Sequence, residues 1–181
     1  MGKVVFFAVG YFANSTKSYN FATVSSNTVT TILMKLNLPP IEARTKTEGG
    51  RIKIWDALRR RYVALTPEEW VRQHFVAFLI GEKGYSPALM ANEVRIELNG
   101  MSRRCDTVVY QRDLRPRVII EYKRPDVKIS QRVFAQICRY NLVMQVDYLI
   151  VSNGLEHYCC RMDYVRQTYE FIDDIPDFKG L

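Results

Sequence analysis

Apolar and polar residues alternate along three consecutive segments in the middle of the chain. The segments cover residues 93–98, 104–111 and 117–123, and turn-forming residues separate them. Alternation with a period of two is typical of β-strands that bury one face. We therefore predict three adjacent strands, of which the second and third form a hairpin that turns at Asp113 and Leu114.

Two other segments carry helical signals and flank this strand region. In the first, Thr66 suits the N-cap, Pro67 suits the first helical position, and Glu69 completes a capping box. The second helix is expected over residues 130–144, with Ser130 as its N-cap. Its apolar side is expected to consist of Phe134, Ile137 and Leu142.

Shorter strands are expected on either side of this region. Residues 51–65 predict two strands joined by a central turn, and residues 147–163 predict two more around an Asn153-Gly154 turn. Residues 168–173 are a further candidate strand. The order helix, three strands, helix, strands predicts an α/β domain.

The amino-terminal part of the chain differs in composition, because the first acidic residue is Glu42. The apolar stretch 4–13 follows a single lysine, as in a secretory signal peptide. However, Tyr11 occupies the −3 position before a cut after Ala13, where a small side chain is needed. This residue argues against secretion.

Two other interpretations of the amino-terminal part remain: a loosely attached arm, or an upstream extension that precedes a natural start at Met34. We favour the second. The chain is accordingly divided into an extension, residues 1–45, and one domain, residues 46–181.

The overall composition is that of a globular protein with a basic bias. Hydrophobic residues make up 48% and charged residues 25%, and no apolar run approaches the roughly 20 residues that cross a bilayer. The net charge of +7 favours polyanionic partners such as nucleic acids, although solubility alone also selects charges of this size. The basic residues cluster at positions 59–61, 103–104, 112–117 and 123–124.

The cysteines and histidines show no metal-binding pattern. The four cysteines are Cys105, Cys138, Cys159 and Cys160. The last two are adjacent in an expected strand, so their side chains point to opposite faces and cannot easily share a metal. We expect reduced thiols in a cytoplasmic protein, and we expect His74 and His157 to take no part in a site.

Two acids and a lysine interrupt the predicted hairpin. If the hairpin turns at residues 113–114, residues whose numbers sum to 227 pair across it, so Asp106 faces Glu121 with roughly 5 Å between their Cβ atoms. The period of two also places Lys123 on the same face as Glu121. Like charges this close destabilise a sheet unless something compensates them.

Two kinds of compensation are open. Arg104 and Lys123 could neutralise both acids in a purely structural network of salt bridges. Alternatively, the two carboxylates form an oxygen-rich site for a divalent cation such as Mg²⁺, with waters and substrate phosphate in the remaining positions. Lys123 could then hold a water, or help to deprotonate it, for attack on phosphorus.

The spacing of these residues resembles a known motif. The pattern is similar to the motif of the PD-(D/E)XK nuclease superfamily: Asp106 is followed by a gap of fourteen residues and then by Glu121-Tyr122-Lys123. Cys105 stands where that motif often has proline. The order of elements is similar to the restriction-endonuclease-like core of that family, in which helices flank a central mixed sheet.

The resemblance extends to the second helix and beyond. Gln136 and Tyr140, four residues apart on one helix face, resemble the Q-x-x-x-Y element of the RecB-like branch. Residues 50–178 resemble the N-terminal nuclease domain of type I restriction enzyme R subunits, in a short stand-alone form. The stretches that carry this likeness are YVALTPEEWVRQHF, RRCDTVVY, IIEYKRPDVKIS and YLIVSNGLEHYCC.

The resemblance implies a Mg²⁺- or Mn²⁺-dependent endonuclease that hydrolyses DNA phosphodiester bonds. It implies that Asp106 and Glu121 bind the metal, that the Tyr122 carbonyl is a further ligand, and that Lys123 positions the attacking water.

The same resemblance assigns roles to both helices. Gln136 and Tyr140 would support the site or contact DNA. Glu69 matches an acid of the first helix that many family members place near the metal, and its alternative role is the capping box.

Other functions remain open at this point. The printed sequence contains no G-x-x-x-x-G-K-[ST] phosphate loop, so ATP-driven movement along DNA is not expected of this chain. The main alternative to an enzyme is a non-catalytic nucleic-acid-binding or assembly module that keeps the nuclease fold, and a nuclease acting on RNA is a third. The expected partners are DNA, other subunits of a restriction system and a second copy of the chain, but no membrane.

Overall fold

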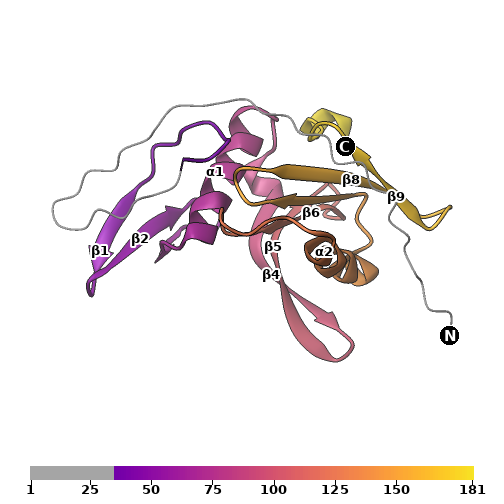
Figure 1. Cartoon of the computed structure of the whole chain (residues 1–181), viewed down its shortest axis with the longest axis horizontal. Helices are drawn as coiled ribbons and strands as arrows, with labels where there is room; N and C mark the ends of the chain where they lie inside the picture. The colour runs from indigo at the N-terminus through magenta and orange to yellow at the C-terminus, as the bar shows by residue number, and fades with distance from the viewer. Residues whose placement is uncertain (1–34) are drawn as a thin grey trace.

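A six-stranded mixed sheet forms the centre of the computed structural model, which describes residues 35–181 (Figure 1). Its strands lie in chain order, and all neighbours are antiparallel except β6 and β7, which run parallel. The strands are β4 (Met90–Leu98), β5 (Met101–Tyr110), β6 (Pro116–Tyr122), β7 (Tyr148–Ser152), β8 (His157–Asp163) and β9 (Thr168–Ile172). A parallel pair needs a long crossover connection, and helix α2 (Gln131–Met144) supplies it.

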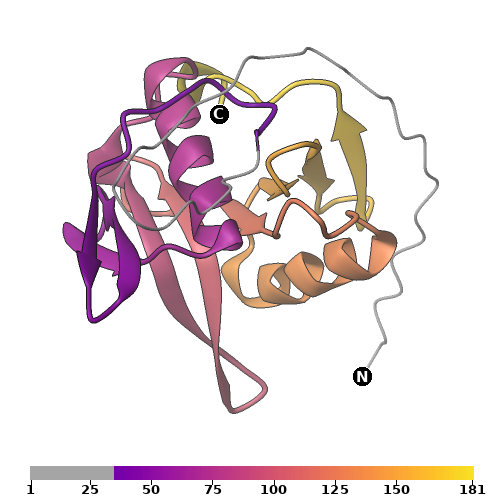
Figure 2. The same cartoon turned by 60° about the vertical axis from the view of Figure 1, so that its left-hand side comes forward.

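Helices α1 (Pro67–Gly81) and α2 cover opposite faces of this sheet (Figures 1 and 2). Phe75 of α1 packs in one core cluster with Ile120, whereas Ile137 of α2 packs in a second cluster with Ile119. Successive strand residues point to opposite faces, which is why sequence neighbours belong to different clusters. The predicted α/β class, with a central mixed sheet flanked by helices, is confirmed.

A separate three-stranded antiparallel sheet precedes α1 (Figure 1, left). Its strands are β1 (Thr45–Glu48), β2 (Arg51–Asp56) and β3 (Arg61–Ala64). Strands β2 and β3 confirm the predicted pair, whereas β1 was not predicted. Two short 3₁₀ helices, η1 (Pro87–Leu89) and η2 (Phe178–Gly180), complete the described elements.

The helix starts were predicted correctly, but not every side-chain contact was. The Thr66 hydroxyl oxygen accepts a hydrogen bond from the Glu69 backbone N–H at 3.0 Å, as expected of an N-cap. The Glu69 carboxylate, however, pairs with Arg59 and Arg72, so its role differs from that of a capping-box acid. Ser130 is the N-cap of α2, although its side chain makes no capping hydrogen bond.

The apolar side predicted for α2 was wrong at one position. Leu142 is 57% exposed, and the buried positions are Phe134, Ile137 and Asn141. These three share a face through the spacings i, i+3 and i+7. Asn141 is buried at little cost because its side chain accepts a hydrogen bond from the Val146 N–H and donates one to the Tyr164 hydroxyl.

Residues ahead of the predicted domain boundary at 46 pack against the domain. Leu36 and Leu38 are buried in the same core cluster as α1. Between them, the backbone N–H of Asn37 donates to the Gly154 carbonyl at 2.6 Å. The packed part of the chain therefore includes part of the segment assigned to the extension. The stretch 4–13 and Met34 lie outside the described residues.

None of the helices between residues 35 and 181 combines the length and the apolar character that a membrane span requires.

Candidate functional site

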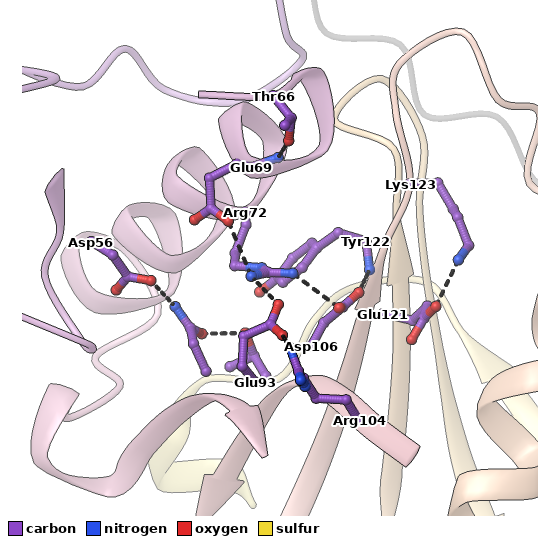
Figure 3. Close-up of polar contacts among 12 residues, drawn as sticks. Asp56, Thr66, Glu69, Arg72, Glu93, Arg104, Asp106, Glu121, Tyr122 and Lys123 are labelled. Carbon is purple, nitrogen blue, oxygen red and sulfur yellow. Dashed lines mark hydrogen bonds and ion pairs between the residues drawn. The ribbon is translucent and has the colours of Figure 1, made fainter. Parts of the chain in front are cut away.

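Strands β5 and β6 separate next to the predicted pair of acids. Their ladder follows the predicted register, with the pairs Val109↔Val118, Val108↔Ile119 and Thr107↔Ile120. One residue further, Asp106 Oδ2 accepts a hydrogen bond from the Tyr122 backbone N–H at 2.8 Å (Figure 3). The Asp106 side chain thus takes the place of a ladder hydrogen bond and is fixed at the end of β6, beside Glu121.

Glu121 is buried and gathers three of the other predicted site residues. Its Oε1 accepts hydrogen bonds from Lys123 Nζ at 2.6 Å and from Gln136 Nε2 at 2.7 Å. Gln136 Nε2 also lies 3.3 Å from the Tyr140 hydroxyl. Within residues 35–181, no hydrogen bond to Glu121 Oε2 is present, so this oxygen is available to another ligand. The structure therefore brings together five residues from three separate segments of the chain: Asp106, Glu121, Lys123, Gln136 and Tyr140.

Each of the two acids has a basic partner, and one of the two partners is the one that the salt-bridge interpretation predicted. Lys123 pairs with Glu121, as expected. Arg104 instead pairs with Glu93, at 2.9 Å. The partner of Asp106 is Arg72 of α1, whose guanidinium lies 2.9 Å from Asp106 Oδ1.

Arg72 is the centre of a buried network that connects three elements (Figure 3). It is only 3% exposed, and it pairs with Glu69 at 3.1 Å and with Glu93 at 2.6 Å as well as with Asp106. Both Glu69 oxygens are in turn held by one nitrogen of Arg59, at 2.8 and 2.9 Å. Buried charges need such partners. The network therefore fixes the orientation of Asp106 from the side of α1.

The same network shows that Glu69, the predicted metal ligand on α1, is directed toward Arg59, Arg72 and Gln73. Its neighbour Glu68 is the acid of α1 that is electrostatically coupled to the site. Burial raises the pKa of Glu68, and the charge of Asp106 raises it further. No hydrogen bond to the Glu68 carboxylate is present among the described residues. Glu68 is thus a further candidate residue of the site, next to the predicted Glu69.

The site carries more negative than positive charge. The carboxylates of the connected cluster are Asp56, Glu68, Glu69, Glu93, Asp106 and Glu121, and its cations are Arg59, Arg72, Arg104 and Lys123. Six acids thus face four bases. Burial raises the pKa of the Glu121 carboxyl to about 7, and the negative charge of Asp106 contributes to this rise.

The neighbouring groups respond to the same surroundings. Burial raises the pKa of Asp106, and this effect exceeds the lowering by Arg72. Burial lowers the pKa of Lys123, but the hydrogen bond and charge of Glu121 outweigh it, so the pKa of Lys123 is raised. Lys123 therefore stays protonated at neutral pH, as an electrostatic role at phosphate requires.

These donors fit a divalent cation that takes only part of its ligands from the protein. Within residues 35–181, no group of three or more His, Cys, Asp or Glu side chains is arranged to hold a metal by itself. Mg²⁺ is commonly held by one or two carboxylates, with waters and substrate phosphate completing its shell. The cluster has two more carboxylates than cations, and Glu121 Oε2 accepts no hydrogen bond among the described residues. Both features match that requirement.

Both histidines form hydrogen bonds within the fold, and the cysteines form no disulfide among the described residues. His74 hydrogen-bonds to the Trp70 carbonyl, and His157 lies between the Ser152 hydroxyl and the Asn37 carbonyl. Cys159 and Cys160 pack in different core clusters, as predicted from their alternation along β8. All four cysteines are free thiols.

Comparison with known proteins identifies one family. The family model described as type I restriction enzyme R protein N terminus matches residues 67–176, which include every predicted site residue. Among solved structures, a fragment assigned as an HsdR subunit of a type I restriction enzyme from Vibrio vulnificus YJ016 is similar, with 18% identity and a TM-score of 0.48. The match covers 65% of this chain and 24% of that chain. The search of curated proteins gave no match.

Proposed function

This chain belongs to the family of the type I restriction enzyme R protein N terminus, and we propose that it is a metal-dependent nuclease that hydrolyses DNA phosphodiester bonds. One observation carries the proposal: Asp106, Glu121, Lys123 and Gln136 converge at the point where β5 and β6 separate. The cluster holds more carboxylates than cations there, and a divalent cation would compensate this excess.

Each residue of the site has a definite task in this proposal. Asp106 and Glu121 would hold Mg²⁺ or Mn²⁺, together with the Tyr122 carbonyl. Glu68 would complete the acidic side from α1, in place of Glu69. When bound, the ion would polarise the phosphate and lower the pKa of water.

The remaining residues act on substrate and on one another. Lys123 would stabilise the negative charge that develops on the phosphate and position the attacking water. Gln136, which donates to Glu121, would keep that carboxylate in the orientation needed for the metal, and Tyr140 supports Gln136.

The experiment that tests this proposal is cleavage of plasmid, single-stranded and branched DNA with Mg²⁺ or Mn²⁺. We expect activity in the wild type and a loss of at least about 100-fold in Asp106→Asn and Lys123→Ala. The exposed Glu97→Gln variant on β4 is the control and should retain activity. Equal, undetectable cleavage by the wild type and both site variants on all substrates would show that the catalytic assignment is wrong.

A second candidate function is a non-catalytic nucleic-acid-binding or assembly module. The observation in its favour is that Arg72 pairs with Asp106 and Lys123 pairs with Glu121. This alternative predicts salt-sensitive DNA binding that a chelator does not change and that Asp106→Asn does not weaken.

The family supports a proposal for the biological setting. We propose that the protein acts in the cytoplasm on DNA, together with other subunits of a restriction system. Cutting both strands of a duplex requires two sites, which a homodimer would supply.

A further inference from the structure

Helix α2 and the segment just before it carry positive charge and contain no acid. From Val127 to Val146 the sequence contains no Asp or Glu, but it contains Lys128, Arg132 and Arg139. All three are exposed, and none forms an ion pair or a hydrogen bond with another described residue. Some other exposed arginines pair with acids: Arg104 with Glu93, Arg115 with Asp113, Arg124 with Asp126 and Arg161 with Glu170. Others form no ion pair among the described residues either. What distinguishes Arg132 and Arg139 is their place on the helix that contacts Glu121 through Gln136.

These cations lie beside the residue that connects α2 to the site. Gln136 donates to Glu121 at 2.7 Å. With about 100° of rotation and 1.5 Å of rise per residue, Arg132 lies about 40° around the helix and about 6 Å before Gln136. Arg139 lies about 60° around the helix and about 4.5 Å after it. Both arginines therefore lie on the exposed side of α2, next to Gln136 and opposite the buried residues Phe134 and Ile137.

The dimensions of this face suit a nucleic-acid strand. Arg132 and Arg139 are about 10 Å apart along the helix axis. Consecutive phosphates of one DNA strand are separated by about 3.4 Å along the duplex axis. If one phosphate is bound beside Glu121, the two arginine side chains can reach phosphates on either side of it. Because no carboxylate of α2 is nearby, phosphate meets no repulsion from this helix.

We propose that Arg132 and Arg139 form a surface that binds the sugar–phosphate backbone of the DNA strand cut at the Asp106–Glu121 site. The inference rests on the proposed function, and it adds the residues that hold the substrate. Gln136 then joins the two parts, because one helix both orients the catalytic carboxylate and holds the strand beside it.

The test measures binding rather than cleavage. Affinity for a short duplex and for a single strand is measured by fluorescence anisotropy in chelator over a range of KCl concentrations. The variant is Arg132→Ala/Arg139→Ala. The control is Arg112→Ala/Arg115→Ala, which removes the same charge from the exposed β5–β6 turn at the opposite end of β6. All four residues are exposed, so both variants should fold.

We expect the α2 variant to reduce the magnitude of the slope of log affinity against log salt by about 1.8 on the duplex and about 1.4 on the single strand, for two lost phosphate contacts. The control should leave the slope unchanged. Arg132→Lys/Arg139→Lys should keep the slope. The surface is wrongly assigned if both alanine variants change the slope equally, if the α2 variant leaves it unchanged, or if the wild type does not bind DNA. Salt-dependent binding through α2 without any cleavage would support this inference while refuting the catalytic proposal, so the two can fail separately.

Discussion

The most informative single substitution in the fold is Arg72→Met, because it removes one charge from the centre of the buried network at nearly constant volume. Arg72 pairs with Glu69, Glu93 and Asp106, and its side chain is 4% exposed. Removal of one partner from a buried ion pair typically costs about 3–5 kcal/mol, because the remaining charge is left without compensation. We therefore expect a loss of about 3–5 kcal/mol in the free energy of unfolding.

A matched control distinguishes burial from charge. Arg104 pairs with the same Glu93, but its side chain is 57% exposed. Exposed pairs contribute about 0–1 kcal/mol, so Arg104→Met should lie in that range. Urea unfolding followed by the fluorescence of Trp55 and Trp70 gives both values. If the two variants lose the same free energy within about 1 kcal/mol, Arg72 does not stabilise the site in the way described.

Three further predictions concern other parts of the molecule. Gly154 has φ +82°, and an added Cβ would lie 2.7 Å from a Leu36 methyl group, whereas Gly84 has φ +69° and open space around it. Gly84→Ala should cost about 1–2 kcal/mol from backbone strain alone, and Gly154→Ala about 1–3 kcal/mol more, measured by urea unfolding; equal costs would exclude the close approach. Burial lowers the pKa of His157, so the unfolded chain binds a proton more readily than the folded one and the contribution of the neutral imidazole is lost as the pH falls below about 6.5. The cost of His157→Gln should accordingly be larger at pH near 8 than near 5, and a constant difference would contradict this. Burial raises the pKa of Glu121 to about 7, so its charged form destabilises the metal-free fold as the pH rises through that value. Glu121→Gln should raise the thermal midpoint in chelator, more at pH 8 than at pH 6, and a lowered midpoint at pH 8 would refute the reasoning.

Local patterns in the sequence were sufficient to predict much of the site. The register of β5 and β6 followed from the alternation and the turn, because a shift of one residue would have moved every side chain to the other face. Gln136 and Tyr140 were predictable as a pair because residues four apart share a helix face. Both predictions depend on geometry within one element or between adjacent ones.

The parts that were missed depend on packing between distant segments. The pairing of Arg72 with Asp106 joins residues 34 positions apart on elements that meet only in the folded chain. Glu68 and Glu69 are adjacent acids in the first turn of α1, and only the packing of the helix determines the direction of each carboxylate. Asn141 is buried in place of Leu142 because it finds hydrogen-bond partners beyond the end of α2, which no helical periodicity contains.

The central claim is that the cluster around Asp106 and Glu121 binds a divalent cation, and calorimetric titration with Mn²⁺ tests it most directly. We predict binding to the wild type and to Glu69→Gln, weaker binding to Glu68→Gln, and none to Asp106→Asn. Wild-type protein that gives no more heat than Asp106→Asn would contradict the account.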